Sequence, residues 1–183
     1  MSSRMRPEAK EIRLRLLDGR DRALYLFAFT DKSMMRFVGE PVGDERAEKA
    51  FSRACASNLM QNLKARTWVV EVGPSGDAAG LLSISVKGAS AEIGGMILPR
   101  WQGLGISGAV FPLGIAEAFS FSEIDEMVIR FSSQNGLAAG LMPKIGFLRT
   151  AESHPDDGLE RWVLRRDEWE RWSVTKRSAN SRQ

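Results

Sequence analysis

The chain has 183 residues, of which 43% are hydrophobic and 27% are charged, the composition of one soluble globular domain. No apolar run approaches the roughly 18 residues of a membrane span, and residues 1–10 lack the apolar segment of a signal peptide, so we expect a cytoplasmic protein. The single cysteine, Cys55, excludes an internal disulfide bond, and one cysteine with one histidine argues against a structural zinc site.

The formal net charge of +3 comes from the two ends of the chain. Residues 1–10 hold three basic side chains and one acidic one, and residues 173–183 hold three basic side chains and no acid. The span 11–172 has 20 basic and 22 acidic residues, a balance that does not favour nucleic-acid binding by the body of the protein. We predict a flexible N-terminus at 1–10, a single domain at 11–172 and a basic flexible tail at 173–183.

The first part of the chain predicts one strand and two helices. Residues 12–17 alternate apolar and basic side chains, which indicates a half-exposed strand. Asp21 is expected to cap a helix that runs into the methionine pair at 34–35, and Asp44 opens a second helix. Every fourth residue of that second helix is apolar: Ala47, Phe51, Cys55, Leu59 and Leu63. We interpret Cys55 as a small buried hydrophobe rather than a nucleophile, and the methionine pair as core rather than the wall of a substrate groove.

The middle of the chain predicts three strands, at residues 67–72, 81–86 and 91–98, whose short links make them an antiparallel meander. A helix follows over 109–119, and Pro112 inside it is expected to produce a kink. The remaining elements are a strand over 126–131, a helix that Asn135 caps, and a strand over 159–166.

A glycine-rich turn lies between the third of these strands and the helix. Pro99 ends the strand, and Gly103, Gly105 and Gly108 follow before the apolar residues of the helix. A turn at this place leaves several backbone N–H groups unpaired at the positive end of the helix dipole, an arrangement suited to a phosphate. The alternative is a tight structural turn, because the spacing fits neither a Walker loop nor a dinucleotide-binding GxGxxG motif.

The crossover helix predicts how the sheet is arranged around this turn. Two strands joined by a helix, here 91–98 and 126–131, must lie parallel and close together. If they separate at their carboxyl ends, a crevice opens beside the glycine turn, where ligands bind in such sheets. The glycine pair at 94–95 favours a bulge or a separation there. We predict an α+β fold, with a mixed, mostly antiparallel sheet that is splayed at its central parallel strands and flanked by helices.

Two motifs in this order resemble those of the GNAT superfamily of acyl-CoA-dependent N-acyltransferases, over residues 11–166. The first resembles the family's pyrophosphate signature, with serine in place of the last small residue, and consists of Gln102, Gly103, Leu104, Gly105, Ile106 and Ser107. The second is an asparagine-led helix at 135–138, followed by a KxGF-type turn at 144–147. The opening strand, the paired helices and the closing strand look most like the branch of ribosomal-protein N-terminal acetyltransferases.

The resemblance implies a GNAT-like fold and an enzyme that moves the acetyl group of acetyl-CoA to a primary amine without a covalent enzyme intermediate. It implies that the pantetheine arm pairs with the strand at 96–98, where a backbone N–H near Met96 polarises the thioester oxygen. The implied cofactor-binding residues are Met96, Ile97, Leu98, Gln102, Gly103, Leu104, Gly105, Ile106, Ser107, Gly108 and Asn135. No metal ion is implied.

Glu92 is the candidate general base, because it lies on the strand beside the crevice, ten residues before Gln102, where family members often carry a catalytic glutamate. The alternative is an outward-facing, solvated side chain, and His154 or a water molecule is the next candidate base. Many relatives also carry a tyrosine that protonates the departing thiolate, but the one tyrosine of this chain is Tyr25, far upstream. A thiol with a pKa of about 8.5 leaves tolerably well without an acid.

Three functions remain open from the sequence. The first is an N-acetyltransferase whose acceptor is a protein N-terminus or a small amine. The second is a CoA-binding sensor without catalysis, suggested by the missing tyrosine and by Ala138 where some relatives carry serine. The third is an RNA or ribosome binder that uses the basic tail. Trp162, Trp169 and Trp172 predict either a homodimer face or the closing part of the core.

Overall fold

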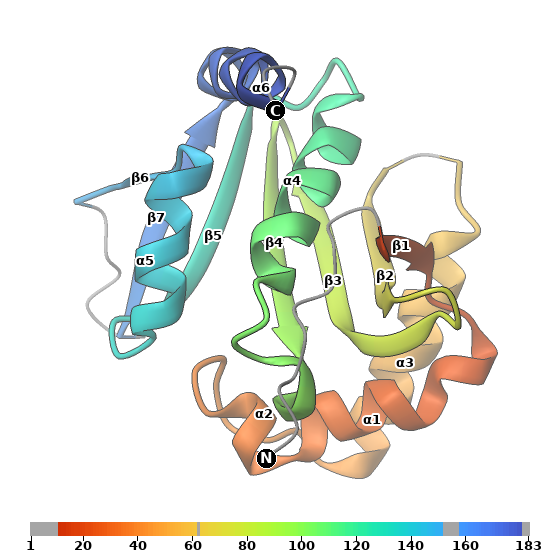
Figure 1. The fold of residues 1–183 in the computed structure, drawn as a ribbon. Coiled ribbons are helices and arrows are strands. Elements are labelled where there is room, and N and C mark those ends of the chain that lie inside the picture. The colour runs from red at the N-terminus through yellow and green to blue at the C-terminus, as the bar shows by residue number, and fades with distance from the viewer. Residues whose placement is uncertain (1–10, 62, 152–157, 181–183) are drawn as a thin grey trace.

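The computed structural model describes residues 11–61, 63–151 and 158–180, so the predicted flexible N-terminus at 1–10 lies outside the described residues. A seven-stranded sheet forms the centre of the fold, in the order β1-β2-β3-β4-β5-β7-β6 (Figure 1). Among the described strands, five neighbouring pairs are antiparallel and only β4 and β5 are parallel. The mixed, mostly antiparallel sheet predicted from the sequence is confirmed.

The strands are β1 (Ile12–Leu16), β2 (Ala65–Val72), β3 (Asp77–Lys87), β4 (Ser90–Ile97), β5 (Glu126–Ser132), β6 (Leu148–Arg149) and β7 (Leu159–Arg165). The α-helices are α1 (Arg22–Thr30), α2 (Lys32–Met35), α3 (Asp44–Asn58), α4 (Ile106–Phe119), α5 (Gly136–Ile145) and α6 (Arg166–Asn180). Two short 3-10 helices are η2 (Gly19–Asp21) and η3 (Pro99–Trp101). Within the described ranges, no helix has both the length and the apolar character needed to cross a membrane.

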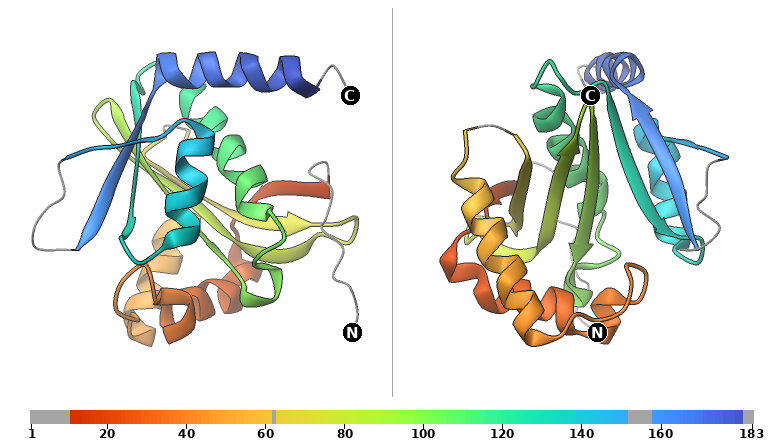
Figure 2. Two further views of the ribbon diagram at one scale, coloured as in Figure 1. Left: turned by 60° about the vertical axis from the view of Figure 1, so that its left-hand side comes forward. Right: turned by 180° about the vertical axis from the view of Figure 1, so that it is seen from behind.

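Helices cover both faces of the sheet (Figure 2). α4 and α5 lie on one face, and their apolar side chains join a larger core with strand residues such as Ile93. α1, α2 and α3 lie on the other face, over a smaller core that includes Tyr25 and Phe51. Because side chains alternate along a strand, β4 contributes to both: Ile93 lies in the larger core, and Met96 packs against the smaller one.

The helix predicted to run from Asp21 into the methionine pair is two helices. Asp31 has an extended backbone, with φ −81° and ψ 129°, so α1 ends at Thr30 and α2 begins at Lys32. The Asp31 carboxylate then caps α2 by accepting hydrogen bonds from the backbone N–H groups of residues 33 and 34, at 2.9 and 3.1 Å. An aspartate in an apolar pattern is a start signal for a new helix, and here it overrides the pattern.

α3 is shorter than predicted, because it ends at Asn58. The amide of Asn58 donates to the carbonyls of Leu17 (2.9 Å) and Thr67 (2.8 Å), which ties the end of the helix to the sheet. Leu59 therefore leaves the helical face and is 88% exposed, contrary to the predicted apolar stripe. Cys55 packs against the smaller core, and burial raises the pKa of its thiol, as suits a small hydrophobe.

α6 extends to Asn180, into the span 173–183 for which the sequence predicted a flexible tail, and residues 181–183 lie outside the described residues. Trp169 and Trp172 stack with ring centroids 4.9 Å apart, and the indole N–H of Trp172 donates to the carbonyl of Lys144 at 2.8 Å. Trp162 and Trp169 lie in the larger core, each 9% exposed. Trp169 and Trp172 thus fasten α6 to the domain, which favours the interpretation of the tryptophans as part of the core over that of a dimer face.

An ion-pair cluster joins β1, β2 and the start of α1. Arg15 donates to Asp21 at 2.8 and 2.9 Å and to Glu71 at 2.6 Å, and Arg13 donates to Glu71 at 2.8 Å. Burial alone would raise the pKa of both carboxylates. Hydrogen bonds outweigh burial, from Arg15 and the Asp18 N–H to Asp21 and from Arg15 and Arg13 to Glu71, so the pKa values of both carboxylates lie below their ordinary values.

This cluster predicts a loss of stability in acid. Because the native pKa values are lowered, the ionised cluster stabilises the fold above the ordinary values of 3.8 and 4.5, and this contribution is lost as the pH falls through the native values. We expect Asp21→Asn to lower the free energy of unfolding by about 1–3 kcal/mol at pH 7 and by less in acid near pH 3. Urea denaturation of both proteins at pH 7 and near pH 3 measures this difference in the free energy of unfolding. Glu45→Gln, which removes an exposed pair with Lys49, is the control and should change stability little; an equal loss for Asp21→Asn at both pH values would contradict the prediction.

Candidate active site

The ladder between β4 and β5 is short. It joins three residue pairs: Ser90 with Glu126, Ala91 with Met127, and Glu92 with Val128. Beyond them both strands continue without pairing to each other, and Figure 1 shows them separating toward α2. We call residues 93–97 of β4, on the side that faces β5, the open edge of β4. The predicted splay is therefore present. Of the two alternatives predicted for the glycine pair at 94–95, a bulge or a separation, the strands show the separation, and β4 keeps a regular register with β3.

Two hydrogen bonds fix the direction of the backbone groups along the open edge. The N–H of Leu98 donates to β3 at 2.8 Å, whereas the carbonyl of Ala89 accepts from the chain at the start of β5 at 2.8 Å. Successive backbone groups of a strand point to opposite sides. The backbone of Met96 therefore points to β3, and the N–H groups of Gly95 and Ile97 point out of the open edge. Of the backbone N–H groups near Met96, those of Gly95 and Ile97 are therefore the ones that face the open edge.

Gly80 on β3 lets the carbonyl of Met96 approach closely. A Cβ at this position would lie 2.1 Å from the Met96 carbonyl oxygen and 2.9 Å from the Ile97 Cα, both backbone atoms. We expect Gly80→Ala to lower the free energy of unfolding by about 1–3 kcal/mol, because β4 has to shift. Gly94→Ala is the matched control on β4, since its Cβ would meet nothing within 4 Å. Chemical denaturation compares the two variants, and equal stability would contradict this account of Gly80.

The glycine turn connects η3 to α4. Gly103 and Gly105 have φ angles of 76° and 79°, in the left-handed region that favours glycine, so the turn itself requires both residues. Gly105 is also the N-cap of α4, which therefore has no side-chain cap, and the first turn of the helix contains no acid. A helix start without a cap or an acid leaves its N–H groups and the positive end of its dipole to an anion.

The other residues of the turn differ in accessibility. Ile106 is 1% exposed, and Leu104 packs against the larger core, so their side chains support the turn from inside. Ser107 is half-buried and Gly108 is exposed. A Cβ at Gly108 would lie 3.7 Å from the side chain of Leu141, which places α5 beside the turn.

Two polar side chains that the sequence assigned to cofactor binding hold the backbone in place. Gln102 Nε2 donates to the carbonyl of Ile97 at 2.8 Å, and this bond ties the glycine turn to the end of the open edge. Asn135 Oδ1 accepts a hydrogen bond from the backbone N–H of Ala138 at 3.1 Å and so caps α5, as predicted. Both side chains shape the site.

Glu92 lies at the start of the open edge, on the face of β4 opposite to Ile93. Its carboxylate accepts a hydrogen bond from Arg130 of β5 at 2.9 Å, and the two side chains are 42% and 44% exposed. The candidate base is therefore paired, neither free nor simply solvated. Arg130 was not among the residues predicted from the sequence, although the alternation of buried residues around it in β5 places it on this face.

A family model described as an acetyltransferase (GNAT) domain matches residues 11–148, which include the open edge, the glycine turn and α5. The chain belongs to the GNAT acetyltransferase family. As a GNAT protein it is an acyl-CoA-dependent N-acetyltransferase, and acetyl-CoA is its cosubstrate. The turn fits the pyrophosphate of such a cosubstrate, because its helix start is uncapped and a Cβ at Gly103 would meet nothing within 4 Å. No curated protein matches the sequence.

Solved structures share the GNAT fold at low sequence identity. Spermidine N-acetyltransferase from Vibrio cholerae, in complex with CoA and spermine, has a TM-score of 0.74 and 18% identity, over 88% of this chain and 99% of that one. Aminoglycoside acetyltransferase AAC(6')-Ib, in complex with coenzyme A, has a TM-score of 0.72 and 16% identity, over 87% and 98%. An acetyltransferase from Agrobacterium tumefaciens has a TM-score of 0.73 and 18% identity, over 88% and 94%. These likenesses show the fold.

The other residues that the sequence suggested for catalysis or substrate binding lie in the core of this GNAT domain or outside the described residues. His154 is outside them. Tyr25 is 7% exposed and packs against Phe29 and Phe51, with ring centroids 4.6 and 5.4 Å away, and burial raises the pKa of its hydroxyl. The methionines at 34–35 are buried, 8% and 5% exposed, as the core interpretation predicted.

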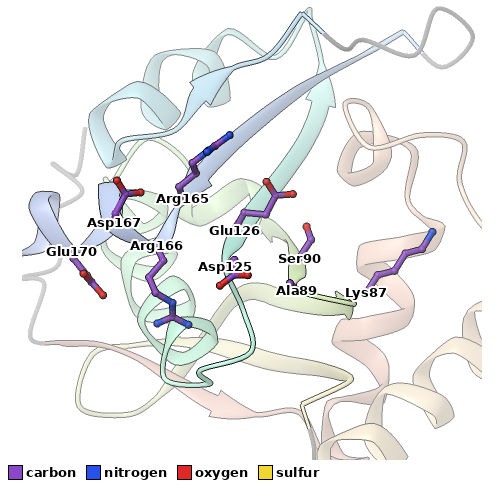
Figure 3. A pocket seen from close by; sticks show the side chains of 9 residues that line it. All are labelled: Lys87, Ala89, Ser90, Asp125, Glu126, Arg165, Arg166, Asp167 and Glu170. Carbon is purple, nitrogen blue, oxygen red and sulfur yellow. The ribbon is translucent and has the colours of Figure 1, made fainter.

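A hollow of about 610 Å³ lies at the other end of the β4–β5 pair (Figure 3). It is lined by Lys87, Ala89, Ser90, Asp125, Glu126, Arg165, Arg166, Asp167 and Glu170. These residues surround the amino ends of the two parallel strands, whereas the glycine turn follows the carboxyl end of β4. The hollow is therefore separate from the glycine turn.

Proposed function

We propose that this GNAT protein acetylates a primary amine by direct attack of the amine on acetyl-CoA, without a covalent enzyme intermediate. The observation that carries the proposal is the open edge of β4, which ends in an uncapped glycine turn. The pantetheine arm would pair with the open edge, as an added strand pairs with an unfilled sheet edge. The pyrophosphate would accept hydrogen bonds from the backbone N–H groups of residues 103–108. This arrangement leaves the thioester near Gly95.

The proposed chemistry assigns one role to each group. An amine with a pKa near 8–10 is mostly protonated at pH 7, so a nearby base raises the rate. The carboxylate of Glu92 takes the proton as the amine nitrogen bonds to the thioester carbon. The N–H of Gly95 or Ile97 donates to the carbonyl oxygen as it becomes negative, and the thiolate of CoA departs. Holding both reactants on one strand supplies much of the rate.

The acceptor is a small amine or a protein N-terminus. Spermidine and aminoglycoside acetyltransferases among the solved structures support a small amine. The resemblance of the sequence to ribosomal-protein N-terminal acetyltransferases supports a protein N-terminus.

A non-catalytic CoA sensor is the second candidate, favoured by the burial of Tyr25, the one tyrosine, in the smaller core. Thiol release from acetyl-CoA tests both candidates, with peptides, polyamines and amino acids as acceptors. Release that depends on an acceptor supports the acetyltransferase. CoA binding without release for any acceptor favours the sensor.

A further inference from the structure

One face of the sheet beside the open edge is rich in arginine. Residues directly opposite each other in neighbouring ladders share a face, and this relation connects six charged side chains of β3, β4, β5 and β7. These six residues, which we call the cationic face, are Lys87, Glu92, Glu126, Arg130, Arg161 and Arg165. Four of them are basic and two are acidic, and the two basic residues in surplus, Lys87 and Arg165, line the hollow with Asp125, Asp167 and Glu170. Figure 3 shows Lys87, Glu126 and Arg165 at the end where the hollow lies.

Both carboxylates of the cationic face already have arginine partners. Glu92 accepts from Arg130 at 2.9 Å, and Glu126 accepts from Arg161 at 3.3 Å. A polycation would have to displace an arginine to reach either carboxylate. The face therefore favours a ligand that brings a negative charge of its own.

Arg130 is the arginine placed to meet such a ligand. It lies two residues beyond Val128, the last residue of β5 in the parallel ladder, so the register continued puts it level with Gly94 on the open edge. It lies directly opposite Arg161 on β7, and like charges in this position destabilise a sheet. Its pair with Glu92 uses one terminal nitrogen, which leaves further guanidinium donors on a side chain that is 44% exposed.

We propose that the acceptor is a small amine that carries a carboxylate, such as an amino acid, and that Arg130 binds this carboxylate in place of Glu92. The guanidinium group matches a carboxylate in a two-bond geometry. The exchange releases the Glu92 carboxylate beside the incoming amine, where it acts as the base. This inference rests on the proposed function and selects one acceptor class for it. Arg130 is then the residue that distinguishes amino acids from polyamines.

Matched acceptors test the proposal with the full chain and acetyl-CoA. Thiol release is measured for each protein amino acid, for the α-amide of each, and for spermidine. We expect at least one amino acid to have a kcat/KM at least about tenfold above that of its own amide, because a hydrogen bond between charged groups discriminates by roughly 10- to 100-fold. Arg130→Gln should raise the KM for that amino acid by about the same factor and so remove the preference for the amino acid over its amide. Arg130→Lys should give an intermediate KM.

Titration calorimetry of the amino acids and amides into the enzyme–CoA complex separates the inference from the activity. An amino acid that binds more tightly than its amide, but causes no thiol release, retains the inference and overturns the proposed activity. Preferred turnover of amides or spermidine overturns the inference and retains the activity. An equal loss for amino acid and amide in Arg130→Gln, or no binding of any amino acid, also overturns the inference.

Discussion

Ser107→Glu is expected to abolish acetyl-CoA binding while leaving the fold intact. Ser107 lies in the first turn of α4, which has neither a side-chain cap nor an acid. A glutamate at a helix start normally stabilises a protein by about 0.3–1 kcal/mol through the helix dipole. Here it would stand where the pyrophosphate is proposed to bind, and two unit charges about 4 Å apart repel by about 4 kcal/mol at an effective dielectric constant of about 20. We expect Kd to rise at least about 100-fold, with the free energy of unfolding unchanged or higher.

Ser107→Gln is the matched control, because glutamine has the size of glutamate without its charge. It should keep the acetyl-CoA affinity within about tenfold of the natural protein. Titration calorimetry gives both Kd values, and urea denaturation confirms that the two variants are folded. If the two variants bind acetyl-CoA equally well, the pyrophosphate does not lie at this helix start.

Glu92→Gln is expected to lower kcat at least about 100-fold, since a positioned general base contributes about 10²- to 10⁴-fold. The Kd for acetyl-CoA should not change, because the open edge binds through its backbone. Glutamine keeps an oxygen that accepts from Arg130, so the contact between β4 and β5 survives the substitution. Steady-state kinetics with a turned-over acceptor and calorimetry with acetyl-CoA measure the two effects separately.

Glu117→Gln is the matched control for this variant. Glu117 lies on α4, accepts from Arg66 at 3.0 Å and is 40% exposed, close to the 42% of Glu92. Its substitution should leave kcat within about twofold, because it only weakens a partly exposed ion pair. Activity of Glu92→Gln equal to that of Glu117→Gln would remove Glu92 from the mechanism and leave a water molecule or His154 as the base.

The parts of the fold that local chemistry determines were predictable from the sequence. Gly103 and Gly105 indicated a turn, and both residues lie in one, with positive φ values. Asn135 indicated a helix start, and its side chain caps α5. The crossover helix required a parallel pair of strands, and β4 and β5 form it. Each of these signals lies within a few residues of the feature that it predicts.

Features that depend on tertiary neighbours were not predictable in the same way. The apolar spacing of α3 continues to Leu59, but the bonds of Asn58 to Leu17, just after β1, and to Thr67 of β2 end the helix first. Which backbone groups of β4 face the open edge depends on the register with β3, so Met96 and Ile97 could not be distinguished. Arg130 looks like an ordinary polar residue of an alternating strand, and only the register of β5 brings it to Glu92.

The most direct test of the central claim, that acetyl-CoA occupies the open edge and the glycine turn, is amide hydrogen exchange with and without acetyl-CoA. We expect slower exchange at Gly95 and Ile97 and at residues 103–108, because their N–H groups gain acceptors. Residues 87–90 and 165–170, around the hollow, should exchange at unchanged rates. Protection around the hollow instead, or binding without protection of the glycine turn, would contradict the account.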